Sequence, residues 1–288
     1  MPELASFAFL NGKSIPVKSA RIAAADHGFL YGEGLFETIK VINGKAMFLV
    51  EHLTRVQSGA KVLKLNTPSI EYMSEGIKQC IEINKVFTGY LRLTLSRGEG
   101  AHSWNPDSCQ HPTFLLIAHH GLPYSKRHYL EGFKAITISF PRNQYSPIVK
   151  IKSLNYSENI LAKMQAREKK ADEGLLLNTC GEVAECSMSN IFLIKKGILK
   201  TPAEDSGLLS GIIRCKLLKY ARKTGLEVME TKIFPDDILT AEEVFITNSL
   251  LGVMPLVSLD GNTLGRPEVL GSYTSKLSAM LAKTEKQE

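Results

Sequence analysis

The stretch Glu182-Val-Ala-Glu185-Cys-Ser-Met-Ser-Asn190-Ile-Phe-Leu-Ile194 decides the interpretation of this chain. One acid, Glu185, stands at the end of an irregular polar run, and a strand of β-branched and aromatic residues follows at once. Most single glutamates are surface acids in loops. The order Glu-x-Ser-x-x-Asn-Ile-Phe at the start of a strand outweighs that interpretation and makes Glu185 a candidate functional residue.

Two upstream segments also carry candidate residues. Val149-Lys150-Ile-Lys152-Ser-Leu-Asn155-Tyr156 contains two lysines just before a predicted helix. If the segment is extended, Lys150 and Lys152 point to the same face, so alternation alone does not separate them. The run Asp26-His-Gly-Phe-Leu-Tyr31-Gly-Glu-Gly-Leu-Phe-Glu37-Thr38 is glycine-rich. It lacks the third glycine and the βαβ context of a nucleotide-binding fingerprint.

The segment Leu209-Ser210-Gly211-Ile212-Ile213-Arg214 is typical of a turn that leads into a helix. Backbone N–H groups and the helix dipole at such an end attract a phosphate dianion, and Gly211 allows close backbone approach. A Ser-Gly pair at a helix start is usually only a cap, so this signal is weak alone. Thr247-Asn248-Ser249 ends a predicted strand and supplies further hydroxyls.

Composition excludes several classes of protein. The chain has 288 residues, 44% hydrophobic and 22% charged, with a net charge of +6 spread along the sequence. Scattered basic residues favour solvated faces or an anionic small molecule over a nucleic-acid groove. We expect a cytoplasmic protein, because no signal peptide or membrane span is evident and no disulfide framework or metal site is indicated. No CxxC pair occurs among the five cysteines, which are Cys80, Cys109, Cys180, Cys186 and Cys215.

Hydrophobic periodicity predicts interleaved helices and strands. We expect helices over residues 51–65, 69–84, 157–171, 211–224 and 267–283. We expect strands over residues 8–12, 37–42, 90–96, 113–118, 135–139, 174–177, 189–194, 198–200, 227–230 and 244–249. Without a regular βαβ period, the pattern indicates mixed α/β or α+β rather than a doubly wound sheet. A polar linker over 122–128, which follows Gly121 and contains Pro123, separates the predicted domains, 1–121 and 129–288.

Together these motifs resemble the class IV (fold-type IV) pyridoxal-phosphate enzymes, over roughly Asp26 to Pro255. That family includes branched-chain and D-amino-acid aminotransferases and aminodeoxychorismate lyases. The resemblance implies an α+β fold with a small N-terminal α/β domain and a larger, β-barrel-like C-terminal domain with helices. It also implies pyridoxal 5'-phosphate as cofactor, a C2 homodimer, small anionic or amino-acid substrates, and neither nucleic-acid nor membrane partners.

The resemblance also implies roles for particular residues. Lys152 matches the Schiff-base lysine, and Glu185 matches the carboxylate that faces the pyridine nitrogen. Arg55, in the context Glu-His-Leu-x-Arg, matches a phosphate-binding arginine. Tyr156 matches a tyrosine that bonds the phenolic oxygen. Further contacts to the cofactor are expected from Ser210, Gly211, Ile212, Ile213, Thr247, Asn248 and Ser249.

Residues on the substrate side are less sharply indicated. Tyr31 is expected to line the pocket. Arg92 and Arg97 lie on or just after an alternating strand, where they could approach a carboxylate or equally be surface charges. Thr38 is a speculative proton donor.

The leading hypothesis for the reaction is conversion of 4-amino-4-deoxychorismate to 4-aminobenzoate and pyruvate in the folate branch, with Lys152 as the proton shuttle. The segment Thr247 to Leu256 looks most like the lyases, whereas Ala101-His-Ser-Trp104 departs from them. The alternative is an aminotransferase acting on D- or branched-chain amino acids with 2-oxoglutarate. A binding protein without turnover is disfavoured, because all the expected chemical residues are present.

Overall fold

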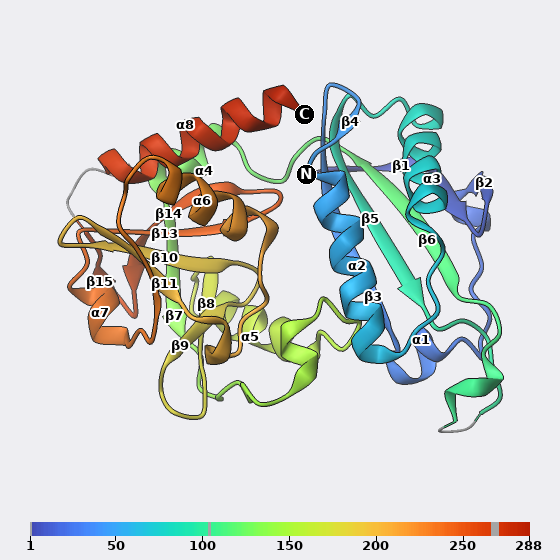
Figure 1. Ribbon diagram of the computed structural model, residues 1–288, viewed down its shortest axis with the longest axis horizontal. Coiled ribbons are helices and arrows are strands. Elements are labelled where there is room, and N and C mark those ends of the chain that lie inside the picture. The colour runs from blue at the N-terminus through green and yellow to red at the C-terminus, as the bar shows by residue number, and fades with distance from the viewer. Residues whose placement is uncertain (1, 103–104, 266–270) are drawn as a thin grey trace. The chain divides into compact units, whose positions relative to one another are not determined.

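The computed structural model describes residues 2–102, 105–265 and 271–288. The chain divides into two compact units. Unit 1 runs up to Pro123 and includes Ile151–Asn155 and the last residue, while unit 2 comprises Tyr124–Lys150 and Tyr156–Gln287. Each unit is built around its own sheet (Figure 1).

Unit 1 contains an antiparallel six-stranded sheet in the order β2-β1-β6-β5-β3-β4. Its elements are β1 (Glu3–Leu10), β2 (Lys13–Pro16), η1 (Val17–Ser19), α1 (His27–Tyr31), β3 (Gly34–Ile42), β4 (Lys45–Ala46), α2 (Leu49–Leu63), α3 (Ile70–Ile83), β5 (Thr88–Ser96), η2 (Pro106–Ser108) and β6 (Thr113–His120).

Helices α2 and α3 pack on the same sheet of unit 1 (Figure 1). Leu53 and Val56 lie three residues apart on α2, so they share one face of the helix and are buried. They join Leu35 and Ile39 of β3 in the core of the unit. Because side chains alternate along a strand, Phe36 and Thr38 point to the opposite face of the sheet.

Unit 2 contains a nine-stranded sheet in the order β12-β11-β10-β13-β14-β7-β8-β9, with β15 paired to β14. Its elements are α4 (Lys126–Glu131), β7 (Phe133–Thr137), η3 (Pro147–Lys150), α5 (Ser157–Glu168), β8 (Glu173–Leu177), β9 (Val183–Cys186), β10 (Asn190–Lys195), β11 (Ile198–Pro202), η4 (Glu204–Ser206), α6 (Ile212–Lys223), β12 (Val228–Thr231), α7 (Pro235–Leu239), β13 (Glu243–Asn248), β14 (Gly252–Leu259), β15 (Asn262–Thr263) and α8 (Ser272–Gln287).

The sheet of unit 2 mixes parallel and antiparallel pairs. Strand β7 is parallel to both β8 and β14, whereas β10 is antiparallel to β11 and β13. The terminal strand β9 also contacts β10 and β11, so the sheet curls back toward itself. This arrangement agrees with the expected α+β class and with the barrel-like second domain.

Local structure differs from the sequence expectations in several places. The predicted linker contains the start of α4, because Ser125 and His128 form a capping box there. Helix α5 ends at Glu168, before the expected end at residue 171. Strand β14 was not predicted. The predicted C-terminal helix began at Pro267, which lies outside the described residues, and α8 begins at Ser272.

The segment Ile151–Asn155 belongs to unit 1, although the sequence analysis placed it in the second domain. Its backbone pairs with strand β3, since Phe36 N donates to Lys152 O at 2.9 Å. Leu154 N likewise donates to Gly34 O at 2.9 Å. Residues 151–155, which follow the other strands of the first sheet along the chain, therefore extend that sheet. This segment carries Lys152, the candidate Schiff-base lysine.

Candidate active site

Lys152 lies on the segment that pairs with β3. The hydrogen bonds on either side fix its backbone, and its ammonium lies 4.3 Å from the centre of the Phe36 ring. A cation over an aromatic face is stabilised electrostatically. The side chain is half-buried. The backbone pairing with β3 and the Phe36 ring therefore hold Lys152 in place on one face of the first sheet.

The structure separates Lys152 from its neighbour Lys150. Lys150 ends the 3₁₀ helix η3 and is exposed, whereas Lys152 is half-buried on the segment that pairs with β3. The premise that both lysines lie in one extended segment is wrong. Pro147 starts the 3₁₀ turn, since its fixed φ suits a helical first residue. The two lysines therefore do not share a face by simple alternation.

Arg92 joins Lys152 on the same ring. Its guanidinium carbon lies 3.6 Å from the centre of the Phe36 ring. The register of β3 and β5 pairs Arg92 with Thr38. Phe36 and Thr38 share a face of β3 because they lie two residues apart. Three predicted residues, Lys152, Arg92 and Thr38, are thus gathered around one aromatic side chain in unit 1.

Arg55 forms part of a buried cluster on the opposite face of β3. It donates from Nε and Nη2 to the two oxygens of Glu37, at 2.7 and 2.8 Å. His52 Nδ1 donates to Glu37 Oε2 at 2.8 Å. Burial would raise the pKa of Glu37, but Arg55 and His52 outweigh it and hold this pKa well below its usual range. Glu37 is therefore an anion at neutral pH.

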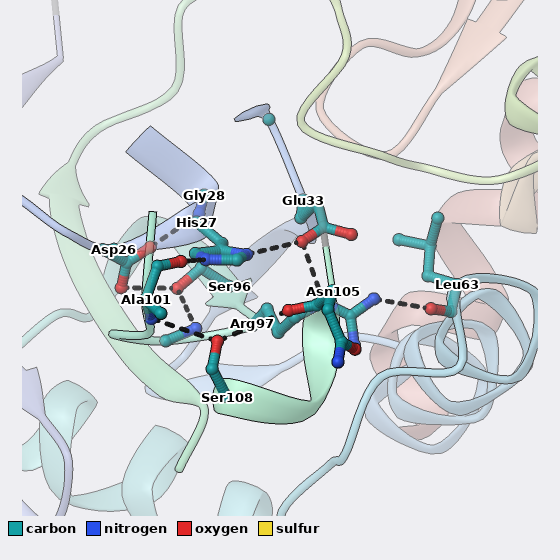
Figure 2. A network of polar contacts seen from close by, with 12 residues as sticks. Asp26, His27, Gly28, Glu33, Leu63, Ser96, Arg97, Ala101, Asn105 and Ser108 are labelled. Carbon is teal, nitrogen blue, oxygen red and sulfur yellow. Dashed lines mark hydrogen bonds and ion pairs between the residues drawn. The ribbon is translucent and has the colours of Figure 1, made fainter. Parts of the chain in front are cut away.

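A polar network fixes helix α1 and the loop that faces it (Figure 2). The buried carboxylate of Asp26 caps α1 by accepting from Gly28 N at 2.7 Å, and it also accepts from Ser96 Oγ at 2.8 Å. His27 is buried, with Nδ1 at 2.9 Å from Glu33 Oε2 and Nε2 at 3.0 Å from Ala101 O. These bonds set the position of α1, which carries Tyr31 at its end.

Tyr31 and Arg97 have different surroundings within this region. The Tyr31 ring packs edge-on against His27, with ring centres 4.9 Å apart. Arg97 is buried and donates to Glu33 Oε2 at 3.0 Å and to the carbonyl oxygens of Leu63 and Lys64 at 2.7 and 3.0 Å (Figure 2). This geometry favours a structural role for Arg97 over contact with a substrate.

Glu185 in unit 2 is held by three donors. Arg142 Nη1 donates to its Oε1, while Asn190 Nδ2 and Leu209 N donate to Oε2 at 3.1 and 3.2 Å. Arg142 is itself buried and also donates to Glu158 Oε2 at 2.7 Å. Burial would lower the pKa of Arg142, but the two carboxylates outweigh it and raise this pKa. The pair is therefore ionised.

The irregular run after Glu185 is ordered by a second buried carboxylate. Glu173 accepts from Ser187 Oγ at 2.9 Å, Ser189 Oγ at 3.0 Å and Met188 N at 3.2 Å. Lys163 pairs with the same carboxylate at 2.9 Å. Because two serines and a backbone amide converge on one acid, the loop between Glu185 and strand β10 is fixed.

Asn190 connects Glu185 to the start of helix α6. Its Nδ2 also donates to Leu209 O at 2.8 Å, and its strand register pairs it with Thr247. A Cβ on Gly211 would lie 2.1 Å from Asn190 Oδ1, so only glycine fits beside it. Four predicted elements therefore meet around one asparagine in unit 2.

The N-terminus of α6 has the character of an anion site. Gly211 is the N-cap, and no side chain caps the first turn, which begins with Ile212 and Ile213. The amides of a first helical turn lack intrahelical partners and point outward along the axis. Ser210 Oγ lies 3.4 Å from Cys215 Sγ, so its hydroxyl stands at this end of the helix.

Thr247, Asn248 and Ser249 play three different parts at the end of β13. Thr247 is buried, and within the described residues its hydroxyl has no hydrogen-bond partner. Asn248 Oδ1 accepts from the amides of Leu250 and Leu251, each at 2.9 Å, and so forms the turn into β14. Ser249 is half-buried in that turn, and Tyr156, elsewhere in unit 2, is half-buried at the N-cap of α5.

Comparison with known proteins decides the family. The model described as "Amino-transferase class IV" matches residues 34–259, which is most of the chain. The chain belongs to the class IV aminotransferase family. Membership confirms the family and the class of pyridoxal-phosphate enzymes that the motifs indicated.

Three class IV relatives show how broad the likeness is. A Methanocaldococcus jannaschii protein named "Putative branched-chain-amino-acid aminotransferase" is 37% identical, with 93% of each chain covered. The aminodeoxychorismate lyase of Bacillus subtilis is 30% identical over 96% of this chain and 93% of its own. A solved structure of a T.th. branched-chain amino acid aminotransferase with pyridoxamine 5'-phosphate has a TM-score of 0.89 and 28% identity, covering 99% of this chain and 95% of that chain. The α+β fold of the family is confirmed.

The clusters described above include residues that the sequence analysis did not single out. Phe36, Glu37 and Asn190 stand inside quoted motifs, where their neighbours drew attention instead. His52 lies three residues before Arg55, at a spacing that places both on one helix face. Arg142 has no local signal. Ser103 and Trp104, part of the run that departs from the lyases, lie outside the described residues.

The remaining structural findings concern partners. No helix among the described residues combines the length and the apolar composition that crossing a bilayer requires. In the same ranges, no group of three His, Cys, Asp or Glu side chains could hold a metal ion.

Proposed function

We propose that this chain is a pyridoxal-phosphate-dependent aminotransferase that moves an amino group between a small amino acid and a 2-oxo acid. The observation that carries the proposal is the placing of the Lys152 ammonium and the Arg92 guanidinium on one ring, that of Phe36. An amine that can hold an aldehyde covalently then stands beside a cation that can bind a carboxylate. The 37% identical relative supports amino transfer, so this reaction is placed ahead of the lyase reaction.

Lys152 moves the proton in this proposal. When bound, pyridoxal phosphate supplies an electron sink that stabilises negative charge at the substrate α carbon. The Lys152 amine would act as the base that takes the substrate α proton on Nζ and would return that proton later in the transfer. Arg92 and Lys152 both contact the Phe36 ring, so a carboxylate held by Arg92 would place the substrate on the sheet face that carries Lys152.

Glu185 acts on the ring nitrogen of the cofactor. An anionic carboxylate at that nitrogen keeps it protonated, because an opposite charge at close range favours the charged form. Arg142, Asn190 and Leu209 hold the carboxylate in one orientation. The electron sink is strongest when this nitrogen stays protonated.

The residues of unit 2 fit a phosphate. The uncapped first turn of α6 presents outward amides, and Gly211 keeps the approach clear of a side chain. The buried Thr247 hydroxyl has no hydrogen-bond partner among the described residues, and Ser249 follows two residues later. We assign these groups and Arg55 to the phosphate, Tyr156 to the phenolic oxygen and Tyr31 to the substrate pocket.

A lyase acting on 4-amino-4-deoxychorismate is the second candidate. Thr38 favours it, because its hydroxyl shares a sheet face with Phe36 and lies opposite Arg92. A hydroxyl there could donate a proton to the departing pyruvate unit. The Bacillus subtilis relative supports this alternative.

Two incubations separate the candidates. An aminotransferase consumes L-leucine or D-alanine only when 2-oxoglutarate is present, and each amino group lost appears in glutamate. A lyase releases fluorescent 4-aminobenzoate and pyruvate from aminodeoxychorismate with no oxo acid added. Formation of 4-aminobenzoate without glutamate would overturn the leading proposal.

The lysine assignment has a matched control in the same segment. Lys152→Ala should abolish the visible absorbance of protein-bound pyridoxal phosphate, because no amine remains to hold its aldehyde. Lys150→Ala should retain that absorbance, since Lys150 is exposed on η3. Retained absorbance in Lys152→Ala would remove Lys152 from the site.

We also propose the C2 homodimer that the family resemblance implies. Sedimentation equilibrium of the protein with cofactor should give twice the mass of the chain. A monomer at micromolar concentration would contradict it.

A further inference from the structure

We propose that Glu37 and His52 are positioning residues that fix the Arg55 guanidinium in the orientation that binds the cofactor phosphate. The inference rests on the proposed function, because it takes Arg55 as a phosphate ligand. Its basis is the buried cluster of unit 1, where one carboxylate on strand β3 receives three hydrogen bonds from two side chains of helix α2.

The hydrogen bonds from Arg55 to Glu37 determine which edge of the Arg55 guanidinium we assign to the phosphate. Arginine has five N–H donors in a rigid plane. Glu37 occupies the side-on edge, since it accepts from Nε and Nη2 of Arg55. The end-on edge between Nη1 and Nη2 is the one that Glu37 does not use, and it suits bidentate contact with phosphate oxygens. Glu37 therefore sets the direction from which Arg55 can bind an anion.

Burial makes this orientation persistent. The side chain of Glu37 is 1% exposed, while that of Arg55 is 16% exposed. A carboxylate without water must keep its partners, so Arg55 cannot swing away without leaving a buried charge unpaired. Immobilising a long side chain before the ligand arrives removes that cost from binding, which amounts to roughly three- to tenfold in affinity.

His52 has a separate part in the cluster. It is 1% exposed, and its Nδ1–H bonds to the same oxygen of Glu37 that accepts from Arg55 Nη2. Two donors on one oxygen define the rotation of the carboxylate about its axis. The ring faces Glu37 of β3, Arg55 of its own helix and Lys152 of the paired segment, and burial is the main cause of its lowered pKa. A neutral His52 adds no charge beside Arg55.

The test compares two ligands that differ by one phosphate. Apo protein is titrated with pyridoxal 5'-phosphate and separately with pyridoxal, and the ratio of dissociation constants isolates the contribution of the phosphate. Arg55→Met should reduce this ratio most. Glu37→Gln should reduce it by roughly three- to tenfold with little change for pyridoxal, and His52→Asn should reduce it less.

The ³¹P chemical shift of bound pyridoxal phosphate gives a second readout. It should move in Glu37→Gln, because the guanidinium no longer faces the phosphate in one orientation. In the double variant Arg55→Met with Glu37→Gln, the ratio should fall no further than in Arg55→Met alone, since Glu37 acts through Arg55.

Asp26→Asn is the matched control. Asp26 is another buried carboxylate of unit 1, and it accepts from Gly28 N and Ser96 Oγ (Figure 2) and from Thr113 Oγ1, in a network separate from the Glu37 cluster. Its substitution destabilises the same unit without altering the Glu37 cluster. The affinity ratio of Asp26→Asn should equal that of the unaltered protein.

Two outcomes overturn the inference alone. One is an unchanged ratio in Glu37→Gln while Arg55→Met reduces it. The other is an equal loss in Asp26→Asn, which would mean that general loosening of unit 1 weakens the phosphate contact. An unchanged ratio in Arg55→Met overturns the phosphate role of Arg55 itself, and with it that part of the proposed function.

Discussion

Two carboxylate–guanidinium pairs, one in each unit, have opposite arrangements. In unit 1 the carboxylate is the more buried side chain, with Glu37 at 1% and Arg55 at 16% exposure. In unit 2 the guanidinium is the more buried side chain, with Arg142 at 2% and Glu185 at 8% exposure. The residue proposed to contact the cofactor is the more exposed one in both. The difference teaches that the more buried partner sets the orientation of the partner that we propose to contact the cofactor.

The two pairs also differ in charge. Glu37 and Arg55 balance one another, and the pKa of His52 is lowered, so the cluster is close to neutral. Arg142 is shared between Glu185 and Glu158, which leaves an excess of one negative charge. A carboxylate whose cation is shared retains attraction for a protonated ring nitrogen. The unit 2 pair is therefore suited to a cationic group and the unit 1 pair to an anion.

The largest predicted effect comes from removing the hidden member of the unit 2 pair. Arg142→Met keeps the side-chain volume but leaves the Glu185 carboxylate buried without a cation, which should cost about 3–5 kcal/mol of unfolding free energy. Urea denaturation of the apo protein at pH 7 measures it. Adding Glu185→Gln to Arg142→Met should recover part of the loss, because the unpaired charge is gone. No recovery would mean that packing, rather than charge, dominates at Arg142.

The sequence identified the exposed members of these pairs better than the hidden ones. Arg55 and Glu185 stand in motifs whose order along the chain is informative. Arg142 lies 43 residues from Glu185 in an irregular stretch, and no local pattern marks it. Its place depends on backbone pairing, since Arg142 N donates to Leu177 O at 2.8 Å and so joins the end of β8. Such a contact depends on which strands are neighbours in the sheet. Hydrophobic periodicity in the sequence does not determine that order.

The fold class could be predicted because it depends on patterns that are local in the sequence. Periodicity distinguishes helices from strands, and the irregular alternation of the two indicates an α+β arrangement. It does not say which strands are neighbours. The grouping of Lys152, Arg92 and Thr38 around Phe36 requires that β3 pairs with β5 and with residues 151–155. The first pairing is a long-range choice, and the second crosses the expected domain boundary.

Acid should weaken the unit 1 pair in a defined direction. Glu37→Gln should cost about 2 kcal/mol at pH 7, because charge-assisted hydrogen bonds to Arg55 are lost. The pKa of Glu37 lies below its usual value of 4.5, so the folded state binds its proton less readily than the unfolded state. Its contribution is therefore complete above 4.5 and declines as pH falls further.

Urea denaturation of the unaltered protein and Glu37→Gln over this range checks that direction. The difference between the two should be largest at pH 7 and shrink on acidification. A difference that grows in acid would show that Glu37 is protonated in the folded protein.

A smaller effect is expected where the unit 2 pair meets helix α6. Gly211→Ala places a Cβ against Asn190 Oδ1, and the amide must turn away from Glu185. The strain should cost about 1 kcal/mol, near the lower end for overpacking, because one side chain can move. Calorimetric melting of Gly211→Ala, Asn190→Ala and the double variant measures it. The double variant should match Asn190→Ala, and full additivity would mean that the two residues do not interact.

Substitution of His52 should change the free energy of unfolding least. It tests the difference in charge between the two carboxylate–guanidinium pairs. His52→Asn should cost less than about 1 kcal/mol, because the amide Nδ2 can replace the Nδ1–H donor to Glu37. The pKa of His52 is lowered from 6.5, chiefly by burial. Below 6.5 the unfolded state therefore holds a proton that the folded state lacks, and stability rises with pH through this window. His52→Asn should remove that part of the slope.

His119 supplies the control for this slope. Its pKa is also lowered by burial, so it contributes in the same direction, and it stacks on Tyr90 rather than on the Glu37 cluster. The His119→Asn variant should keep the part of the slope that belongs to His52, and the double variant should lose both. If His52→Asn retains the full slope, His52 is already protonated below 6.5 in the folded protein. The unit 1 cluster would then carry an extra positive charge. Its net charge would differ from that of the negative cluster around Arg142 by more than we propose.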